Sequence, residues 1–332
     1  MADRNPALPK RMWDRCYPWV LYSGDWGRLM SKAVLTCTRD VFAGCKKWRR
    51  AALIAVAITA FLLPADAAFA ATLELNGTIR TSPFTGSSVS MGDNEGSAFV
   101  PSDNSLWLAD DGKKKIYEVD AATGALKRTI ARSAFNNAPM FGGGPAAGTD
   151  RTNDFESIAY DRANDVLYVF SGKCCTSSIL PTAFRLTRQS GPFQVESYQA
   201  LPTGADYTGA AWSPTDGKIY VGKGRDIRSF DYESGTASPP FRVGGVSGIT
   251  GMDFSPDGTD LFVTVNSEKL IRINWATKTV VSGWTFDLTP FGIRDSRAVA
   301  RIGNQFFVSD GYDSRPTGDP LRHAVFVLDD TT

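Results

Sequence analysis

The sequence predicts an all-β fold, a single β-propeller of about five four-stranded blades. One pattern recurs five times, in which two short apolar segments flank a turn rich in Pro, Asp, Asn and Gly. β-branched and aromatic residues dominate the second segment, a composition that favours strands over helices. A repeat period of about 40 to 60 residues is typical of propeller blades, and an open β-sandwich with similar hairpins is the alternative. The five copies are 96–112, 156–172, 208–224, 250–266 and 297–311.

Two further strands complete most of these repeats. A third strand with period-two alternation follows each pair, and a turn with Thr-Gly or a near relative leads to a weaker fourth strand. The last copy reaches Thr332 without a fourth strand. Residues 72–80 alternate like a strand, so we expect them to complete the last blade and to close the ring without a free sheet edge. The expected third strands are 115–120, 183–188, 227–232, 270–275 and 324–329, and the fourth strands are 126–130, 194–199, 241–243 and 280–284.

Residues 1–70 are predicted to be a leader, which leaves 71–332 as the propeller domain. An uncharged apolar core spans 51–63 after a basic flank, and Ala68-Phe69-Ala70 offers a signal-peptidase site with cleavage after Ala70. The apolar run is shorter than the roughly 20 residues that span a bilayer, and an uncleaved anchor is the alternative. We therefore expect a secreted, periplasmic or cell-envelope protein that meets the membrane only through its signal peptide during export.

Charge and cysteine content agree with export. The leader carries 11 basic and 5 acidic residues, which leaves 25 basic and 30 acidic residues for 71–332. A mildly acidic domain is a poor partner for phosphate backbones, which argues against nucleic-acid binding. Only Cys174 and Cys175 lie in this part, and an even count fits an oxidising compartment.

These two cysteines are adjacent in the chain. Neighbouring Cα atoms lie about 3.8 Å apart, below the usual disulfide range of about 4.4 to 6.8 Å, so a bridge between them is strained. We expect a vicinal disulfide between Cys174 and Cys175, with free thiols or an intermolecular bond as the alternatives.

Acidic and polar residues are predicted to gather at one mouth of the central channel. In a propeller the innermost strand begins, and the second strand ends, on the same face of the ring. Their oxygens are the hard ligands that Ca²⁺ prefers, although solvated carboxylates or caps of exposed backbone amides are the alternative. The residues before inner strands are Glu95, Glu156, Tyr207 and Asp295, and those that end second strands are Asp110, Asp111, Lys173, Lys223, Asn266 and Asp310.

Histidine content limits the chemistry. The chain has one histidine, His323, which excludes a three-histidine zinc site and haem or copper sites that need several histidines. A Ser-His-Asp triad would have to use His323, and no G-x-S-x-G motif accompanies it. We expect an ordinary surface or rim histidine. The candidate catalytic residues are Glu95, Glu156, Asp295 and His323.

The blade sequences resemble known propeller families. The hairpins at 213–224 and 255–266 resemble the repeats of YVTN and NHL-type propellers. The blade openings at Glu95-Gly96 and Phe155-Glu156-Ser157 resemble those of the gluconolactonase/strictosidine-synthase superfamily and of bacterial esterase-like propellers. Those relatives usually have six or seven blades. The resemblance implies a metal site for Ca²⁺, with Glu95, Glu156, Asn266 and Asp310 as ligands.

The function expected from these observations is ligand binding. The propeller is predicted to bind a small molecule, glycan, peptide or cell-surface partner at one mouth of its channel. The alternatives are a Ca²⁺-dependent hydrolase of lactonase or esterase type, and an enzyme of a secreted biosynthetic pathway. Many unrelated functions share this architecture, so the site must decide between them.

Overall fold

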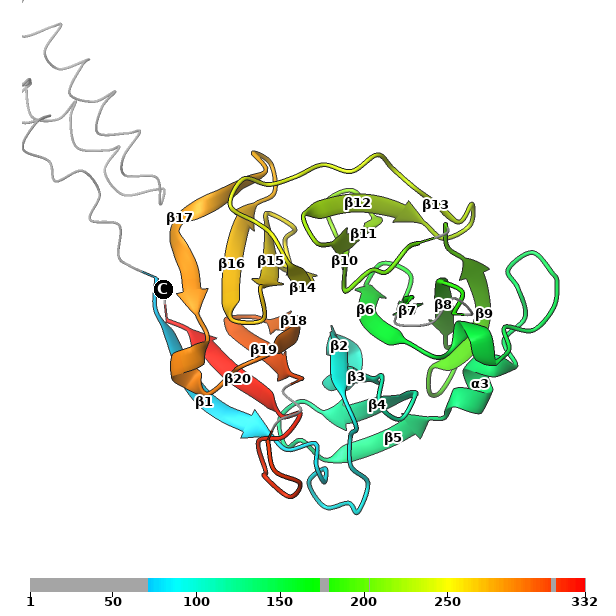
Figure 1. Ribbon diagram of the computed structural model, residues 1–332, viewed down its shortest axis with the longest axis horizontal. Helices are drawn as coiled ribbons and strands as arrows, with labels where there is room; N and C mark the ends of the chain where they lie inside the picture. Colours follow the sequence, from blue (N-terminus) through cyan, green and yellow to red (C-terminus); the bar gives the residue numbers. More distant parts are fainter. Residues whose placement is uncertain (1–70, 174–178, 203, 312–314, 332) are drawn as a thin grey trace, which may run out of the picture. The chain divides into compact units, whose positions relative to one another are not determined.

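The described part of the chain forms a ring of five four-stranded antiparallel sheets, as predicted (Figure 1). The computed structural model describes residues 71–173, 179–202, 204–311 and 315–331. Successive inner strands β2, β6, β10, β14 and β18 pack against one another around the ring, and β18 returns to β2. The predicted leader, its cleavage site and the Cys174–Cys175 pair lie outside the described residues. Among those described, no helix is both long and apolar enough to cross a membrane.

Blades 1 and 2 each follow the chain from the channel outward. A short helix and two 3-10 turns connect their strands: α3 (Arg132–Asn136), η2 (Pro101–Asp103) and η3 (Thr149–Arg151). The strands are β2 (Asn94–Val100), β3 (Ser105–Asp110), β4 (Lys115–Asp120), β5 (Leu126–Ile130), β6 (Phe155–Asp161), β7 (Val166–Ser171), β8 (Thr182–Thr187) and β9 (Gln194–Ala200).

Blades 3 and 4 repeat this order, and blade 5 takes its outermost strand from the start of the domain. The 3-10 turn η4 (Thr289–Phe291) joins blades 4 and 5. The strands are β10 (Gly209–Ser213), β11 (Lys218–Lys223), β12 (Asp226–Asp231), β13 (Thr236–Ala237), β14 (Ile249–Phe254), β15 (Asp260–Val265), β16 (Lys269–Asn274), β17 (Thr279–Asp287), β18 (Ser296–Ile302), β19 (Gln305–Asp310), β20 (Val325–Asp330) and β1 (Leu73–Ile79).

The predicted closure of the ring is confirmed. Strand β1 pairs antiparallel with β20, and the register places Leu75 opposite Leu328 and Thr78 opposite Phe326. The pairing continues just beyond the strands, because the backbone N–H of Thr331 donates to the carbonyl of Thr72 at 3.1 Å. Strand β1 therefore covers the edge of β20 that would otherwise be open in the last blade.

The hydrophobic core is divided into five clusters, each between two neighbouring blades. One cluster joins blades 1 and 2 around Trp107 and Phe184, and its counterpart between blades 3 and 4 surrounds Tyr220 and Trp275. Strand side chains alternate between the two faces of a blade, so each middle strand contributes to the clusters on both sides. Packing between blades, rather than one central core, holds the ring together.

Small residues at the start of each inner strand allow the blades to meet at the centre. A Cβ atom on Gly96 would lie 2.7 Å from Ser157 Cα, and one on Gly251 would lie 2.6 Å from Ala298 Cα. Real Cβ atoms do not approach other atoms so closely. The Gly, Ser or Ala in each repeat is thus required by the close approach of backbones around the channel.

The structure differs from the sequence prediction in blade 3. Its fourth strand is β13, two residues long, rather than 241–243. Phe241 forms only an isolated pair with Ile227. Pro239 and Pro240 lie between these two segments and have no backbone N–H to donate, so they interrupt the outer strand.

Candidate functional site

A β-bulge lies at the start of four of the inner strands. The strand register shifts between Asn94 and Gly96 in blade 1, and the same shift occurs in blades 2, 4 and 5. A bulged residue is left out of the ladder, and bulges commonly redirect a side chain beside a functional site. Because all inner strands begin on one face, these residues surround one mouth of the channel. They are Glu95, Glu156, Thr250 and Arg297, with Thr208 at the matching position before β10.

An aspartate lies two residues before the bulge, or before the matching Thr208, in four of the five blades. The local sequences are D-N-E-G, D-F-E-S, D-Y-T-G and D-S-R-A, and Gly248 replaces the aspartate in blade 4. This spacing is visible in the sequence, but the predicted repeats begin two or three residues after the aspartates, and only Asp295 was predicted to lie at the mouth. The aspartates are Asp93, Asp154, Asp206 and Asp295.

Three of these mouth residues form a compact acidic cluster. Carboxylate oxygens of Asp154, Glu156 and Asp206 all lie within 4.8 Å of one another. Asp206 also accepts the backbone N–H of Lys173 at 3.2 Å and pairs with Lys223 Nζ at 3.4 Å. The cluster joins blade 2 to the connection that leads into blade 3.

Gly172 leaves the space between these carboxylates open. A Cβ atom at this position would lie 2.3 Å from Asp206 Oδ1, 2.9 Å from Glu156 Cγ and 3.1 Å from Asp154 Oδ2. Gly172 is also anchored, since its N–H donates to the Asp154 carbonyl at 2.7 Å. Any side chain at residue 172 would therefore occupy the region on which the three carboxylates converge.

A second group of charges continues around the mouth. Arg297 bridges two carboxylates, because its Nη1 lies 3.3 Å from Glu95 Oε2 and its Nη2 lies 2.7 Å from Asp295 Oδ2. On the other side of Glu95, Lys114 Nζ pairs with Asp111 Oδ1 at 2.6 Å. The mouth is therefore asymmetric, with most carboxylates beside blades 1 and 2 and a guanidinium at blade 5.

Burial and mutual repulsion disfavour the ionised forms of the two glutamates. Burial raises the pKa of Glu156 well above its usual value, and the charges of Glu95, Asp154 and Asp206 raise this pKa further. Burial likewise raises the pKa of Glu95, although Arg297 partly opposes this effect. A nearby positive charge would favour the ionised carboxylates. A cation bound beside the two glutamates would therefore offset the repulsion between these carboxylates.

The structure gives the other predicted metal ligands different surroundings. Asp310 is fully buried; its carboxylate accepts the Asp295 N–H at 2.9 Å and pairs with Arg315 Nη2 at 3.1 Å. Asn266 belongs to blade 4, where its backbone N–H donates to the Gly248 carbonyl. Neither Glu95 nor Asp310 is part of the three-carboxylate cluster, whereas Glu156 is.

Several other predicted mouth residues have structural roles. Asp110 is fully buried and accepts backbone N–H groups of Gly92, Asp93 and Lys113, so it holds the loop before blade 1. Tyr207 is buried, with its ring edge-on to Phe170. These side chains support the mouth rather than line it.

The expectation that His323 lies at the surface or rim is wrong. His323 is 1% exposed, and its backbone carbonyl accepts hydrogen bonds from Thr81 Oγ1 at 2.7 Å and Asn94 Nδ2 at 3.3 Å. Arg322 Nε lies 3.1 Å from His323 Nε2. The histidine is thus enclosed where blade 5 meets blade 1, a contact that its position at the start of a strand did not reveal.

Comparison with known proteins supports the fold and no narrower family. No protein-family model and no curated protein matches the sequence. A glutaminyl cyclase of Myxococcus xanthus has a similar structure, with a TM-score of 0.54, 12% identity, and coverage of 79% of this chain and 98% of that chain.

Two further solved structures show weaker similarity. A gluconolactonase of Xanthomonas campestris has a TM-score of 0.46 and 13% identity, over 78% of this chain and 89% of that chain. A luciferin-regenerating enzyme has a TM-score of 0.47 and 14% identity, over 79% of this chain and 95% of that chain. The chain is thus a five-bladed β-propeller, and the predicted resemblance to propeller proteins is confirmed at the level of the fold.

Proposed function

We propose that this protein is an exported propeller that binds an oxygen-rich ligand at the channel mouth with the help of Ca²⁺. The observation that carries the proposal is the convergence of Asp154, Glu156 and Asp206 within 4.8 Å around the space left by Gly172. Export rests on the signal-peptide pattern of the leader. The ligand classes that suit such a mouth are small hydroxylated molecules, glycans and peptides.

The donor set fits Ca²⁺ better than a transition metal. All three side chains offer carboxylate oxygens, which are hard ligands, whereas zinc and copper sites use nitrogen or sulfur from His and Cys. Ca²⁺ takes six to eight oxygens in flexible geometry, so three carboxylates leave room for backbone, solvent or ligand oxygens. A bound cation would supply positive charge that polarises an oxygen of the ligand.

The remaining mouth residues would orient the ligand. Arg297 presents a guanidinium that is 36% exposed, and Lys223 presents an ammonium on the other side of the cluster. A ligand with a carbonyl or carboxylate oxygen can meet Arg297 while another of its oxygens faces the acidic cluster. Glu95 holds Arg297 in place through the 3.3 Å ion pair.

Hydrolysis of a lactone or ester is the second candidate function. It is favoured by Glu95, whose pKa is raised by burial beside the acidic cluster. A carboxyl group with a raised pKa can hold a proton near neutral pH and exchange it with a reacting group. In this mechanism Glu95 would act as the general acid or base and Arg297 would hold the ligand oxygen.

Calcium titration tests the proposal. Elemental analysis of the purified domain and thermal unfolding with increasing CaCl₂ would be measured for the natural protein, Glu156→Gln and Glu74→Gln. Glu74 is an exposed glutamate on β1, so its substitution is a matched control. We expect the natural protein and the control to be stabilised by Ca²⁺ and Glu156→Gln to lose this response. Equal Ca²⁺ responses in all three proteins would rule out the cluster as the binding site.

Activity assays separate the two candidate functions. A panel of lactones and aryl esters would be offered to the Ca²⁺-loaded protein and to Glu95→Gln. Turnover that Glu95→Gln abolishes would support the hydrolase, whereas Ca²⁺-dependent ligand binding without turnover would support the binding protein.

A further inference from the structure

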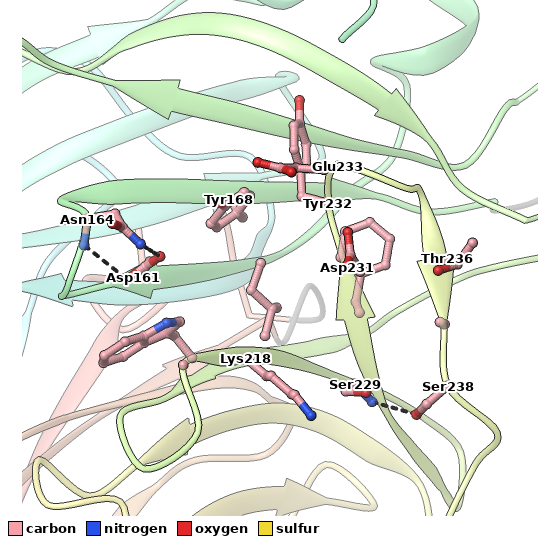
Figure 2. A pocket seen from close by; sticks show the side chains of 15 residues that line it. Asp161, Asn164, Tyr168, Lys218, Ser229, Asp231, Tyr232, Glu233, Thr236 and Ser238 are labelled. Atoms are coloured by element: carbon pink, nitrogen blue, oxygen red, sulfur yellow. Dashed lines mark hydrogen bonds between the residues drawn. The ribbon is translucent and has the colours of Figure 1, made fainter. Parts of the chain in front are cut away.

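A second concave site lies between blades 2 and 3, on the face opposite the acidic mouth. Its cavity measures about 520 Å³ and is formed by the turns after β6 and β10 and by the turn that joins β12 to β13 (Figure 2). Asp161 ends β6, whereas Glu156 is near the start of the same strand. A strand advances about 3.3 Å per residue, so five residues separate the two sites by roughly 16 Å.

The short outer strand of blade 3 accounts for this cleft. Strand β13 has two residues, whereas the outer strands β5, β9, β17 and β1 have five, seven, nine and seven. The outer part of blade 3 consequently has less surface to pack against blade 2. Tyr168 of β7 and Tyr232, which follows β12, then meet across the gap with ring centroids 5.3 Å apart.

Aromatic and acidic side chains dominate the lining. Four aromatic residues contribute to the wall, namely Tyr168, Trp212, Phe230 and Tyr232. Three carboxylates accompany them, whereas Lys218 supplies a single ammonium, so the lining is negative overall. The carboxylates are those of Asp161, Asp231 and Glu233.

The Tyr168 hydroxyl and the Glu233 carboxylate are among the polar groups of the lining that are available to a ligand. Tyr168 is 9% exposed, and its hydroxyl has no hydrogen-bond partner among the described residues, although it lines the cavity. The Glu233 carboxylate likewise has no side-chain partner within the described ranges. Asp161, in contrast, accepts the backbone N–H groups of Ala163 and Asn164. Figure 2 shows the bonds that Asn164 donates to Asp161.

We propose that this cleft binds an organic cation, an ammonium group carrying alkyl substituents. The negative faces of aromatic rings attract a cation, and such aromatic cages recognise quaternary ammonium groups. Glu233 supplies the opposite charge, and the Tyr168 hydroxyl can accept a hydrogen bond where the ammonium carries a proton. An anion would be repelled by the three carboxylates, and a neutral alkyl group would gain nothing from them.

The site is separate from the acidic mouth in its chemistry. Its aromatic walls suit alkylated cations, whereas the mouth has closely spaced oxygens that suit a metal ion. The proposal therefore does not depend on Ca²⁺ binding, and chelation of Ca²⁺ should leave the cleft functional.

The test compares choline with its neutral isostere, 3,3-dimethyl-1-butanol, by isothermal titration calorimetry and ligand-detected NMR. We expect choline to bind and the alcohol to bind at least about tenfold more weakly, because only choline gains the charge interactions. Glu233→Gln should weaken choline binding by about tenfold, and Glu74→Gln should not. Tyr168→Phe keeps the aromatic ring and should therefore retain choline binding. The same variant should bind propylammonium more weakly, because that ligand donates a hydrogen bond to the Tyr168 hydroxyl.

Three results would overturn the proposal. The first is no detectable choline binding to the natural protein. The second is equal binding of choline and the neutral alcohol, which would indicate a merely apolar cleft. The third is unchanged choline binding in Glu233→Gln. Circular dichroism of each variant would verify folding before these results are interpreted.

Discussion

Substitution of Gly172 by alanine tests the acidic cluster with a single methyl group. The new Cβ would lie 2.3 Å from Asp206 Oδ1, so the Asp206 carboxylate must move by at least about 0.7 Å to reach a 3.0 Å contact. The methyl group would also fill the space on which the three carboxylates converge. Gly172→Ala should therefore abolish Ca²⁺ binding without removing any carboxylate.

The size of the expected effect follows from ligand linkage. A ligand at one hundred times its dissociation constant stabilises the folded state by about 2.7 kcal/mol. A domain of this size changes its melting temperature by roughly 2 to 4 °C per kcal/mol, so Ca²⁺ should raise it by roughly 5 to 11 °C. Gly172 does not have a positive φ, and Asp206 has a partly exposed side chain that can turn away. Without Ca²⁺ the variant should thus stay within about 1 kcal/mol of the natural protein.

Scanning calorimetry with EDTA and with saturating CaCl₂ measures both quantities. Gly244→Ala is the matched control, because Gly244 is exposed and a Cβ there would meet no atom within 4 Å. The control should keep the full Ca²⁺ shift. A Ca²⁺ shift in Gly172→Ala as large as in the control would refute the assignment of this space to the cation.

Three other predictions concern the mouth and the ring. Without Ca²⁺, the free energy of unfolding should fall as the pH rises from about 4.3, the usual pKa of an unfolded glutamate, because Glu95 and Glu156 bind protons more tightly in the folded state. Urea unfolding at a series of pH values measures this free energy, and an increase with pH would contradict the prediction. Arg297→Gln should tighten Ca²⁺ binding at low salt, because it removes a positive charge from the mouth. Titration calorimetry measures the Ca²⁺ affinity, and an unchanged affinity would show that the Arg297 charge does not act on the Ca²⁺ site. Phe326→Ala should cost about 3 to 5 kcal/mol in chemical denaturation, because Phe326 is 1% exposed beneath the closing strand.

The fold could be predicted from the sequence because its rules are local and repeated. Each hairpin carries its own strand and turn signals, and five copies at a similar spacing identify the ring. Pairing of residues 72–80 with the last blade followed from an unfilled strand position, and Thr78 indeed lies opposite Phe326. The outer strand of blade 3 was placed incorrectly, because Phe241 has strand character but follows two prolines.

The site was less predictable, because it depends on one-residue details of register. The predicted site included Glu95 and Glu156 but not Asp154 and Asp206, which lie two residues before Glu156 and Thr208. It also included Asp310 because of its position at a strand end. Asp310 is instead buried, where its carboxylate pairs with Arg315 five residues further along the chain and accepts the Asp295 N–H, and the strand pattern predicts neither contact.

The unequal residues at the four bulges and at the matching position of blade 3 give the mouth a direction. The backbone of the ring is nearly fivefold, and such a frame alone would accept a molecule in five equivalent rotations. Glu95 and Glu156 mark one side of this frame, two threonines follow, and Arg297 completes the circuit. A polar molecule that binds across the opening therefore has one preferred orientation among the five that the backbone would allow. The repeated blades thus form a site that has no fivefold symmetry.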